Sequence, residues 1–267
     1  MHISFFILAA LLYTVCAGLP SPYRKTITTV TLVGWLLHGM ALGTDVLLPA
    51  SLRLGFAVML SATLWISVAA YLLENRNFAL DGLRILVLPC AAVAVLLPLL
   101  FPGSVVSLEG KSVFFSWHVA IAMLAYSTLT IAAFHAVLMT LQESRLHAAG
   151  ATKGLLAAAL DRLPALLTME RLLFRLIGFG FVLLTLTVLS GIVFSEQLFG
   201  TAVKWNHKTI FTMLSWILFG VLLLGRVWRG WRGKTALRFT LSGFVTLLLA
   251  YVGSRFVLEV VLHRGLA

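Results

Sequence analysis

The segment that decides the fold begins with Lys204-Trp205-Asn206-His207-Lys208 and continues as the apolar run T-I-F-T-M-L-S-W-I-L-F-G-V-L-L-L-G up to Gly225. A run of this length and composition can cross the roughly 30 Å hydrocarbon core of a bilayer as a helix. The tryptophan and the two lysines before it are typical of the boundary between lipid and water. The segment therefore predicts a transmembrane helix over 207–225 that starts at a membrane face.

The whole chain has the composition of a membrane protein, because 61% of its 267 residues are hydrophobic and only 11% are charged. A water-soluble surface needs more charge than this, and the alternating ten-residue segments of an outer-membrane barrel are absent. We predict an all-α, polytopic helical bundle that forms a single membrane domain. Its eight expected spans are about 2–19, 27–48, 53–73, 83–101, 113–141, 174–194, 207–225 and 237–262.

The distribution of basic residues predicts the orientation of these spans. The loops on one side hold 2, 2, 5 and 5 of the 20 lysines and arginines, which is 14 in all, and the other side holds 6. Loops rich in lysine and arginine stay in the cytoplasm, so both termini are expected outside. The net charge of +11 is then a sign of membrane topology and not of nucleic-acid binding.

The longest connection, 142–173, is expected on the cytoplasmic side. Residues Leu155–Leu167 form a candidate amphipathic helix on the inner leaflet, where a connector is favoured over a docking site for a partner. The apolar start, Met1–Leu19, has no basic residue before it and is interpreted as a first span rather than a cleaved signal peptide. Cys16 and Cys90 form no CxxC motif, which argues against thiol–disulfide exchange.

Three of the seven histidines are predicted to lie at the outer face. His118 lies about one turn and a half into the fifth span, next to Trp117. His207 starts the seventh span two residues after Trp205, and His263 ends the eighth. Neutral imidazole is a standard axial ligand of haem iron, and aromatic rings pack well on a porphyrin. We therefore predict a haem b site in which His118 and His207 ligate the iron. The cations expected near the haem propionates are Lys204, Lys208 and Arg255.

Each of these residues also has a purely structural interpretation. His207 and His263 could be ordinary interfacial residues, and His38, in the middle of the second span, could simply hydrogen-bond a neighbouring helix. Arg255 could pair with Glu259 one turn later and so neutralise a charge inside the membrane. His135 is expected to satisfy a backbone carbonyl rather than to bind a ligand.

Several motifs resemble one family of membrane proteins. The stretch from Trp205 to Thr209 is followed by Leu214-Ser215-Trp216 and by Gly230-Trp231-Arg232-Gly233-Lys234, which is similar to the closing half of the CcsA/ResC/CcmC-type cytochrome c assembly proteins. His118-Val119 with Tyr126-Ser127 resembles the HV…SY helix of that family. The segment from Gly253 to His263 resembles its final helix. The resemblance covers 110–267 and is strongest to the short YpjD-like and HemX-like branch.

Members of this family handle haem, and some present it for attachment to apocytochrome c on the outer face. By position, His118 and His263 match the external histidines of the family, and His38 stands for a membrane histidine that contacts the cofactor. The tryptophan-rich external motif is reduced to Trp205, and Asn206-His207 replaces an Asp-Pro pair. The resemblance thus implies haem binding or handling in the bacterial inner membrane rather than a complete cytochrome c synthetase.

Two other functions remain open at this point: a small-solute transporter without a cofactor, and a non-catalytic regulator of haem metabolism. A transporter would show broken helices with paired glycines or prolines near mid-membrane. A regulator would work through the cytoplasmic loop 142–173. The chain has no nucleotide-binding loop and no paired-carboxylate site, so haem ligation would need partner proteins, such as other cytochrome c assembly components. The sequence does not predict the oligomeric state.

Overall fold

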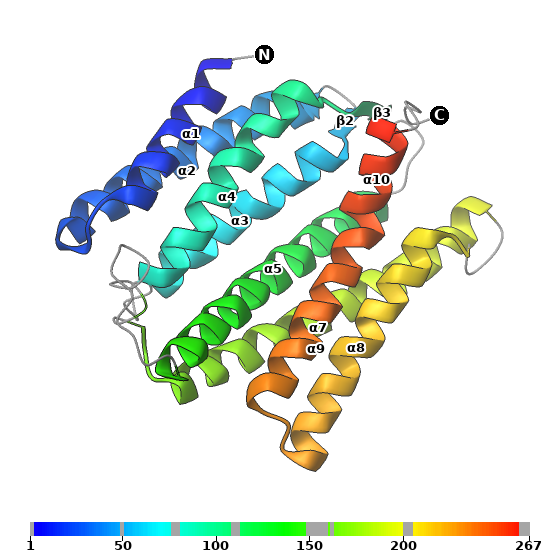
Figure 1. Cartoon of the computed structure of the whole chain (residues 1–267). Helices are drawn as coiled ribbons and strands as arrows, with labels where there is room; N and C mark the ends of the chain where they lie inside the picture. The colour runs from blue at the N-terminus through cyan, green and yellow to red at the C-terminus, as the bar shows by residue number, and fades with distance from the viewer. Residues whose placement is uncertain are drawn as a thin grey trace.

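The computed structural model describes residues 3–48, 51–75, 81–107, 113–147, 160, 163–199 and 205–261. Seven of its helices are long and apolar enough to cross a membrane. An eighth, α1 (Ile3–Gly18), is apolar but has 16 residues, which makes it about 24 Å long. The protein is therefore a polytopic helical membrane protein (Figure 1).

The N-terminal half consists of α1, α2 (Arg24–Val46), α3 (Phe56–Glu74) and α4 (Asp81–Leu100), with a short 3-10 turn, η1 (Ser21–Tyr23), before α2. Helices α1 and α3 each pack against both α2 and α4. Trp35 on α2 and Trp65 on α3 stack in parallel at 5.0 Å, and each indole N–H donates to the backbone carbonyl of the other residue. This reciprocal pair fixes α2 against α3, since two buried donors and a large ring contact are satisfied together.

The C-terminal half consists of α5 (Val113–His147), α7 (Leu166–Phe199), α8 (His207–Arg229) and α9 (Gly233–Leu248). After α9 the last helix continues as a π-helical turn, η2 (Leu249–Gly253), a short α10 (Ser254–Phe256) and a second π-helical turn, η3 (Val257–Val261). Helix α5 packs along α7, and it also contacts α3 and α9. It therefore joins the two halves, as its central place in Figure 1 shows.

A small sheet closes one end of the bundle, which we call the sheet end. Strands β1 (Leu47–Leu48), β2 (Ser51–Leu54) and β3 (Ser104–Ser107) are antiparallel in the order β1-β2-β3, with Arg53 opposite Val105. Gly103 has φ +76°, and a Cβ there would lie 2.6 Å from the carbonyl oxygen of Leu54, so only glycine fits this close approach. The first residues of α1, α5 and α8 lie toward this end, and so does α10 in the last helix (Figure 1).

The opposite end carries the connection between α8 and α9, and we call it the turn end. Between Arg229 and Gly233 the chain reverses with φ +65° at Gly230 and +52° at Gly233. The N–H of Gly230 bonds to the carbonyl of Gly225, which closes α8 with a left-handed cap. The predicted inner side of the membrane corresponds to this end, and the predicted outer side to the sheet end.

Each of the eight predicted spans is helical over most of its described residues, but residues 47–48 and 53–54 lie in strands and two further expectations need correction. The sheet was not predicted, because strands of two to four residues are too short to give a periodic signal. Helix α7 begins at Leu166 rather than at 174, which shortens the predicted loop 142–173. The candidate amphipathic helix, Leu155–Leu167, lies largely outside the described residues.

Candidate functional site

His118 lies in the second turn of α5 and faces α7. Its Nδ1 is 2.8 Å from the hydroxyl oxygen of Ser190. The side chain is half-buried, and a Cβ on Gly191 would lie 3.5 Å from its Cε1, so the ring rests on the backbone of α7. The adjacent residues Ser190 and Gly191 of α7 thus form the surface that the imidazole contacts, and we call this contact the seat of His118. Trp117, the neighbour of His118, points outward with 64% of its surface exposed.

The hydrogen bonds of Ser190 decide which tautomer of His118 is present. Its hydroxyl is 2.7 Å from the carbonyl of Leu186 and 3.1 Å from that of Thr187, so its single proton is donated to α7 itself. With that proton on α7, the serine oxygen is an acceptor, and we assign His118 Nδ1 as the donor. This assignment leaves the lone pair of the imidazole on Nε2, the atom that commonly binds iron.

The start of α8 holds several of the predicted site residues. Asn206 is the N-cap, because its side-chain oxygen accepts from the Thr209 backbone N–H at 3.0 Å and from the Thr209 hydroxyl at 3.1 Å. This bond explains why an asparagine stands before the helix. His207, the first helical residue, is exposed, and Trp205 is 71% exposed. Helix α8 packs on α7, so His118 and His207 belong to helices that share one neighbour.

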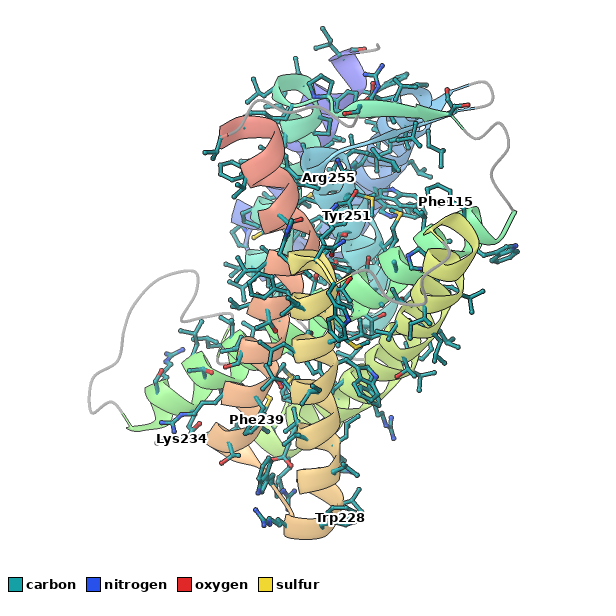
Figure 2. The ribbon with its side chains drawn as sticks, turned by 90° about the vertical axis from the view of Figure 1, so that its right-hand side faces the viewer. Phe115, Trp228, Lys234, Phe239, Tyr251 and Arg255 are labelled. Atoms are coloured by element: carbon teal, nitrogen blue, oxygen red, sulfur yellow. The ribbon has the colours of Figure 1, made fainter. Side chains whose placement is uncertain are left out.

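Tyr251, in the π-helical turn η2, lies between two cations. Lys208 Nζ is 5.8 Å from the centre of its ring, and the Arg255 guanidinium is 5.9 Å away. Arg255 is buried, with 8% of its surface exposed, and Figure 2 shows it next to Tyr251 on the last helix. One turn before, the Tyr126 hydroxyl of α5 donates to the carbonyl of Leu247. The start of α8 and the segment η2–α10 thus bring two predicted propionate contacts, Lys208 and Arg255, together near one aromatic ring.

His38 lies elsewhere, in the middle of the N-terminal half. It is fully buried, its Nδ1 is 3.3 Å from the Tyr13 hydroxyl, and its Nε2 is 2.9 Å from the Ser61 hydroxyl. The structural interpretation of His38 predicted bonds of this kind to neighbouring helices. Both ring nitrogens are engaged, so iron binding by His38 would require one of these hydroxyls to move away. Its contact with the cofactor stays a prediction.

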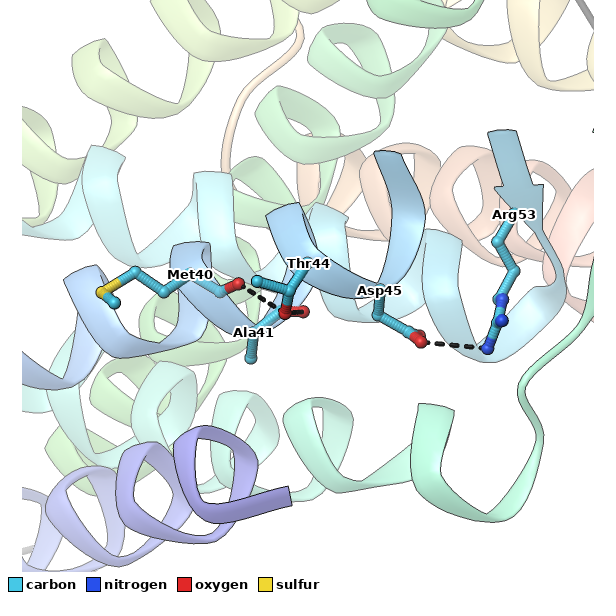
Figure 3. A network of polar contacts seen from close by, with 5 residues as sticks. All are labelled: Met40, Ala41, Thr44, Asp45 and Arg53. Carbon is cyan, nitrogen blue, oxygen red and sulfur yellow. Dashed lines mark hydrogen bonds and ion pairs between the residues drawn. The ribbon is translucent and has the colours of Figure 1, made fainter. Parts of the chain in front are cut away.

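Two buried polar pairs were not found from the sequence. His135 bonds through Nδ1 to the Ile131 carbonyl at 3.0 Å, which confirms that expectation, but its Nε2 is also 3.4 Å from Glu74 on α3. At the sheet end Asp45, with 4% of its side chain exposed, pairs with Arg53 at 2.9 Å (Figure 3). Glu74 and His135 are far apart in the sequence, and Asp45 and Arg53 meet only because the strands fold back beside the end of α2, so neither pair follows a helical spacing.

The G-W-R-G turn that carries part of the family resemblance has a structural explanation. Glu170 on α7 is buried and binds Arg226 at 2.8 Å and Arg232 at 2.7 Å through the same oxygen. Trp231 lies on Gly225, where a Cβ would come within 2.3 Å of the indole, and its ring packs on Phe239 at 5.0 Å. The Glu170 carboxylate therefore holds this turn against α7, and the Trp231 ring packs it on α8 and α9.

Some predicted residues cannot be placed. Lys204, His263 and the side chains of His147 and Glu259 lie outside the described part of the structure, so the predicted Arg255–Glu259 pair is not described. Within the described ranges, no three His, Cys, Asp or Glu side chains converge on a possible metal position.

Comparison with known proteins agrees with this architecture. A family model described as "Cytochrome C assembly protein" matches residues 2–262. Inner membrane protein YpjD of Escherichia coli (strain K12) is 33% identical over 144 residues, which cover 54% of this chain and 52% of YpjD. Cytochrome c biogenesis protein CcsA of Guillardia theta is 30% identical over 156 residues, or 55% of this chain and 52% of CcsA.

CcsA of Gloeobacter violaceus is 32% identical over 114 residues, which cover 43% of this chain and 33% of that protein. The chain thus spans about half the length of the first curated relatives it matches. No solved structure matches it. Because the family model extends over nearly the whole chain, this protein belongs to the cytochrome c assembly protein family.

Proposed function

We propose that this protein binds haem b at the sheet end of its C-terminal half and handles it for cytochrome c assembly in the bacterial inner membrane. Membership of the cytochrome c assembly protein family supports a role in cytochrome c assembly. The similarity to the inner membrane protein YpjD supports a place in the inner membrane. The observation that carries the proposal is the seat of His118, which presents a neutral imidazole of defined tautomer at one end of a membrane bundle.

The donor set at this end has the chemistry that haem requires. A histidine held through Nδ1 by a fixed oxygen is how proteins orient an imidazole that ligates iron. Lys208 and Arg255 offer positive charge for the two propionates, and Tyr251 and the exposed Trp117 offer aromatic surface for the porphyrin. The bound haem would supply the iron porphyrin that is delivered to a partner; the protein residues bind and orient it.

The second axial ligand is proposed to be His207. His207 is exposed at the start of α8, and the N-cap bond of Asn206 to Thr209 fixes the backbone beside it. His263 at the end of the chain is the alternative second ligand. The two cases differ in which single substitution changes the spin state of the iron.

The test is an absorption spectrum of the protein purified in detergent, with added hemin, first oxidised and then reduced with dithionite. We expect a Soret band and sharp reduced α and β bands, as for low-spin iron with two axial ligands. His118→Ala together with His207→Ala should abolish these bands, and each single change should weaken binding and alter the spin state. His147→Ala is the matched control and should leave the spectrum unchanged.

The single variants His207→Ala and His263→Ala identify the second ligand. If His207→Ala alone leaves a low-spin spectrum and His263→Ala does not, the second ligand is His263. If the wild-type protein takes up no hemin, the haem proposal is wrong. The transporter and regulator interpretations would then be tested by solute uptake in vesicles and by deletion within 142–173.

A further inference from the structure

The turn end of the C-terminal half carries a basic surface that the proposed haem site does not use. We call it the turn patch, and it consists of Val227, Trp228, Arg229, Arg232, Lys234 and Arg238. All six residues are exposed, and both Val227 and Trp228 have 78% of their surface exposed. Figure 2 shows Trp228 and Lys234 at this extremity of the molecule, far from Arg255.

The charge of this end is only partly neutralised within the protein. The α8–α9 turn itself has five basic residues, Arg226, Arg229, Arg232, Lys234 and Arg238, and the two carboxylates paired with it, Glu143 and Glu170, leave three of these charges uncompensated. Glu170 binds Arg226 and Arg232, and Glu143 lies 3.9 Å from Lys234. Arg232 uses its Nε for Glu170, and 54% of its side chain stays exposed. The positive charge of the turn that these carboxylates do not compensate therefore lies on exposed side chains.

The position of the patch identifies the surroundings. It lies where the candidate membrane span 207–229 ends and the next span, 233–256, begins. An exposed tryptophan and valine beside arginines combine an apolar surface for acyl chains with charges for headgroups. Clusters of basic residues at the ends of neighbouring spans attract anionic lipids, by about 1 kcal/mol for each charge near the surface.

We propose that the turn patch is a binding site for the phosphate headgroup of an anionic phospholipid. The Arg229, Lys234 and Arg238 cations contact the phosphate region, and the Trp228 ring lies at the level where headgroups meet acyl chains. The Glu170 bonds to Arg226 and Arg232 fix the turn, so the site exists before the lipid binds. This inference is independent of the proposed haem function, because none of its residues belongs to the haem site.

The experiment measures phosphatidylglycerol binding to the whole protein in detergent, by native mass spectrometry and by the rise in thermal unfolding temperature on adding the lipid. Arg229→Gln with Arg238→Gln should weaken phosphatidylglycerol binding by roughly 10- to 30-fold, since two exposed charges are lost. Neither arginine has an ion pair in the described structure, so the fold should persist. Phosphatidylcholine, which has no net charge, should bind weakly to both proteins.

A matched control removes the same charge from the same side of the membrane. Lys25→Gln with Arg175→Gln changes two exposed basic residues, one on α2 and one on α7, that are not part of the turn patch. Its phosphatidylglycerol binding should stay within about twofold of wild type. If the control loses as much as the patch variant, the attraction is a general effect of positive charge and the proposed site is wrong.

Trp228→Ala distinguishes a lipid from a free phosphate. Loss of the ring should reduce phosphatidylglycerol binding and leave any effect of inorganic phosphate on the unfolding temperature unchanged. If inorganic phosphate stabilises the protein as much as phosphatidylglycerol does, the lipid assignment is wrong. Equal binding of phosphatidylglycerol and phosphatidylcholine to the wild type would also overturn it.

Discussion

At the scale of single residues, one serine controls the proposed iron ligand. The Ser190 hydroxyl donates its proton to α7 and accepts from His118 Nδ1. Ser190→Ala should therefore leave the imidazole free to rotate and weaken haem binding by about 10- to 100-fold, as seen when such supporting bonds are lost. Hemin titration monitored at the Soret band measures the change.

The control for this variant is Ser144→Ala, which removes an exposed hydroxyl near the other end of the same bundle. Its hemin affinity should equal that of the wild type. Unchanged affinity in Ser190→Ala itself would show that the bond to His118 does not contribute to ligand orientation.

The Asp45–Arg53 pair allows a second prediction at this scale. Asp45 is buried, and its Oδ2 has no hydrogen-bond partner among the residues that the structure describes, so the ion pair of its Oδ1 with Arg53 compensates its charge. Arg53→Gln should destabilise the protein by about 2–3 kcal/mol, because a buried charge loses its partner while about a quarter of Arg53 is solvent-exposed.

Adding Asp45→Asn to Arg53→Gln removes both charges, and this double variant should recover most of the lost stability. The thermal unfolding temperature in detergent measures both effects. Equal stability of the wild type and Arg53→Gln would show that the pair contributes nothing.

At the scale of elements, the α8–α9 turn depends on α7. Glu170 accepts from both Arg226 and Arg232, and hydrogen bonds to charged groups contribute about 1.5–3 kcal/mol each when they are not exposed. Since Arg232 is half exposed, we expect Glu170→Gln to cost about 2 kcal/mol in total. Lys234→Gln in the same turn should be nearly neutral, because its pair to Glu143 is long and exposed. Thermal unfolding of both variants in detergent compares them, and equal losses would contradict this account.

The elements also show what the sequence could predict. Apolar runs longer than about 18 residues gave the helices, because the bilayer demands internal hydrogen bonding throughout a span. The beginning of α7 was missed because Glu170, Arg171 and Arg175 read as loop residues. In the structure Glu170 is buried by arginines from another turn, which no local pattern reveals.

The same limit applies to the candidate site. Interfacial tryptophans and basic residues indicated the end of the bundle at which a site was expected. The order of the spans alone places His118, Lys208 and Arg255 on that side. Their partners do not follow from this order, since the contacts with Ser190 and Tyr251 depend on how α5, α7, α8 and the last helix pack. The two hydroxyls around His38 come from α1 and α3 and are equally invisible to local reasoning.

At the scale of the whole molecule, the two halves meet at the sheet end through three phenylalanines. Phe56 at the start of α3 packs on Phe101 at 5.1 Å and on Phe256 of α10 at 5.4 Å. Phe56 is buried, so Phe56→Ala should cost about 3–5 kcal/mol through the lost packing and the cavity left behind. The last helix should also lose its fixed position, so hemin affinity should fall with stability.

Phe179→Ala is the comparison for this variant, because Phe179 is 61% exposed on α7 and faces away from the bundle. It should change neither unfolding temperature nor hemin affinity. A Phe56→Ala protein with normal hemin affinity would mean that the halves support each other in stability but not in ligand binding.

The stacked Trp35–Trp65 pair also gives the protein a built-in optical reporter. Two stacked indoles at 5.0 Å are close enough to couple their electronic transitions, so the near-ultraviolet circular dichroism of the wild type should change when either tryptophan is replaced by phenylalanine. Trp117 and Trp205 lie near the proposed porphyrin, and their fluorescence should be quenched by energy transfer when hemin binds. Circular dichroism would then report on the packing of the N-terminal half, and tryptophan fluorescence would report on hemin binding to the C-terminal half.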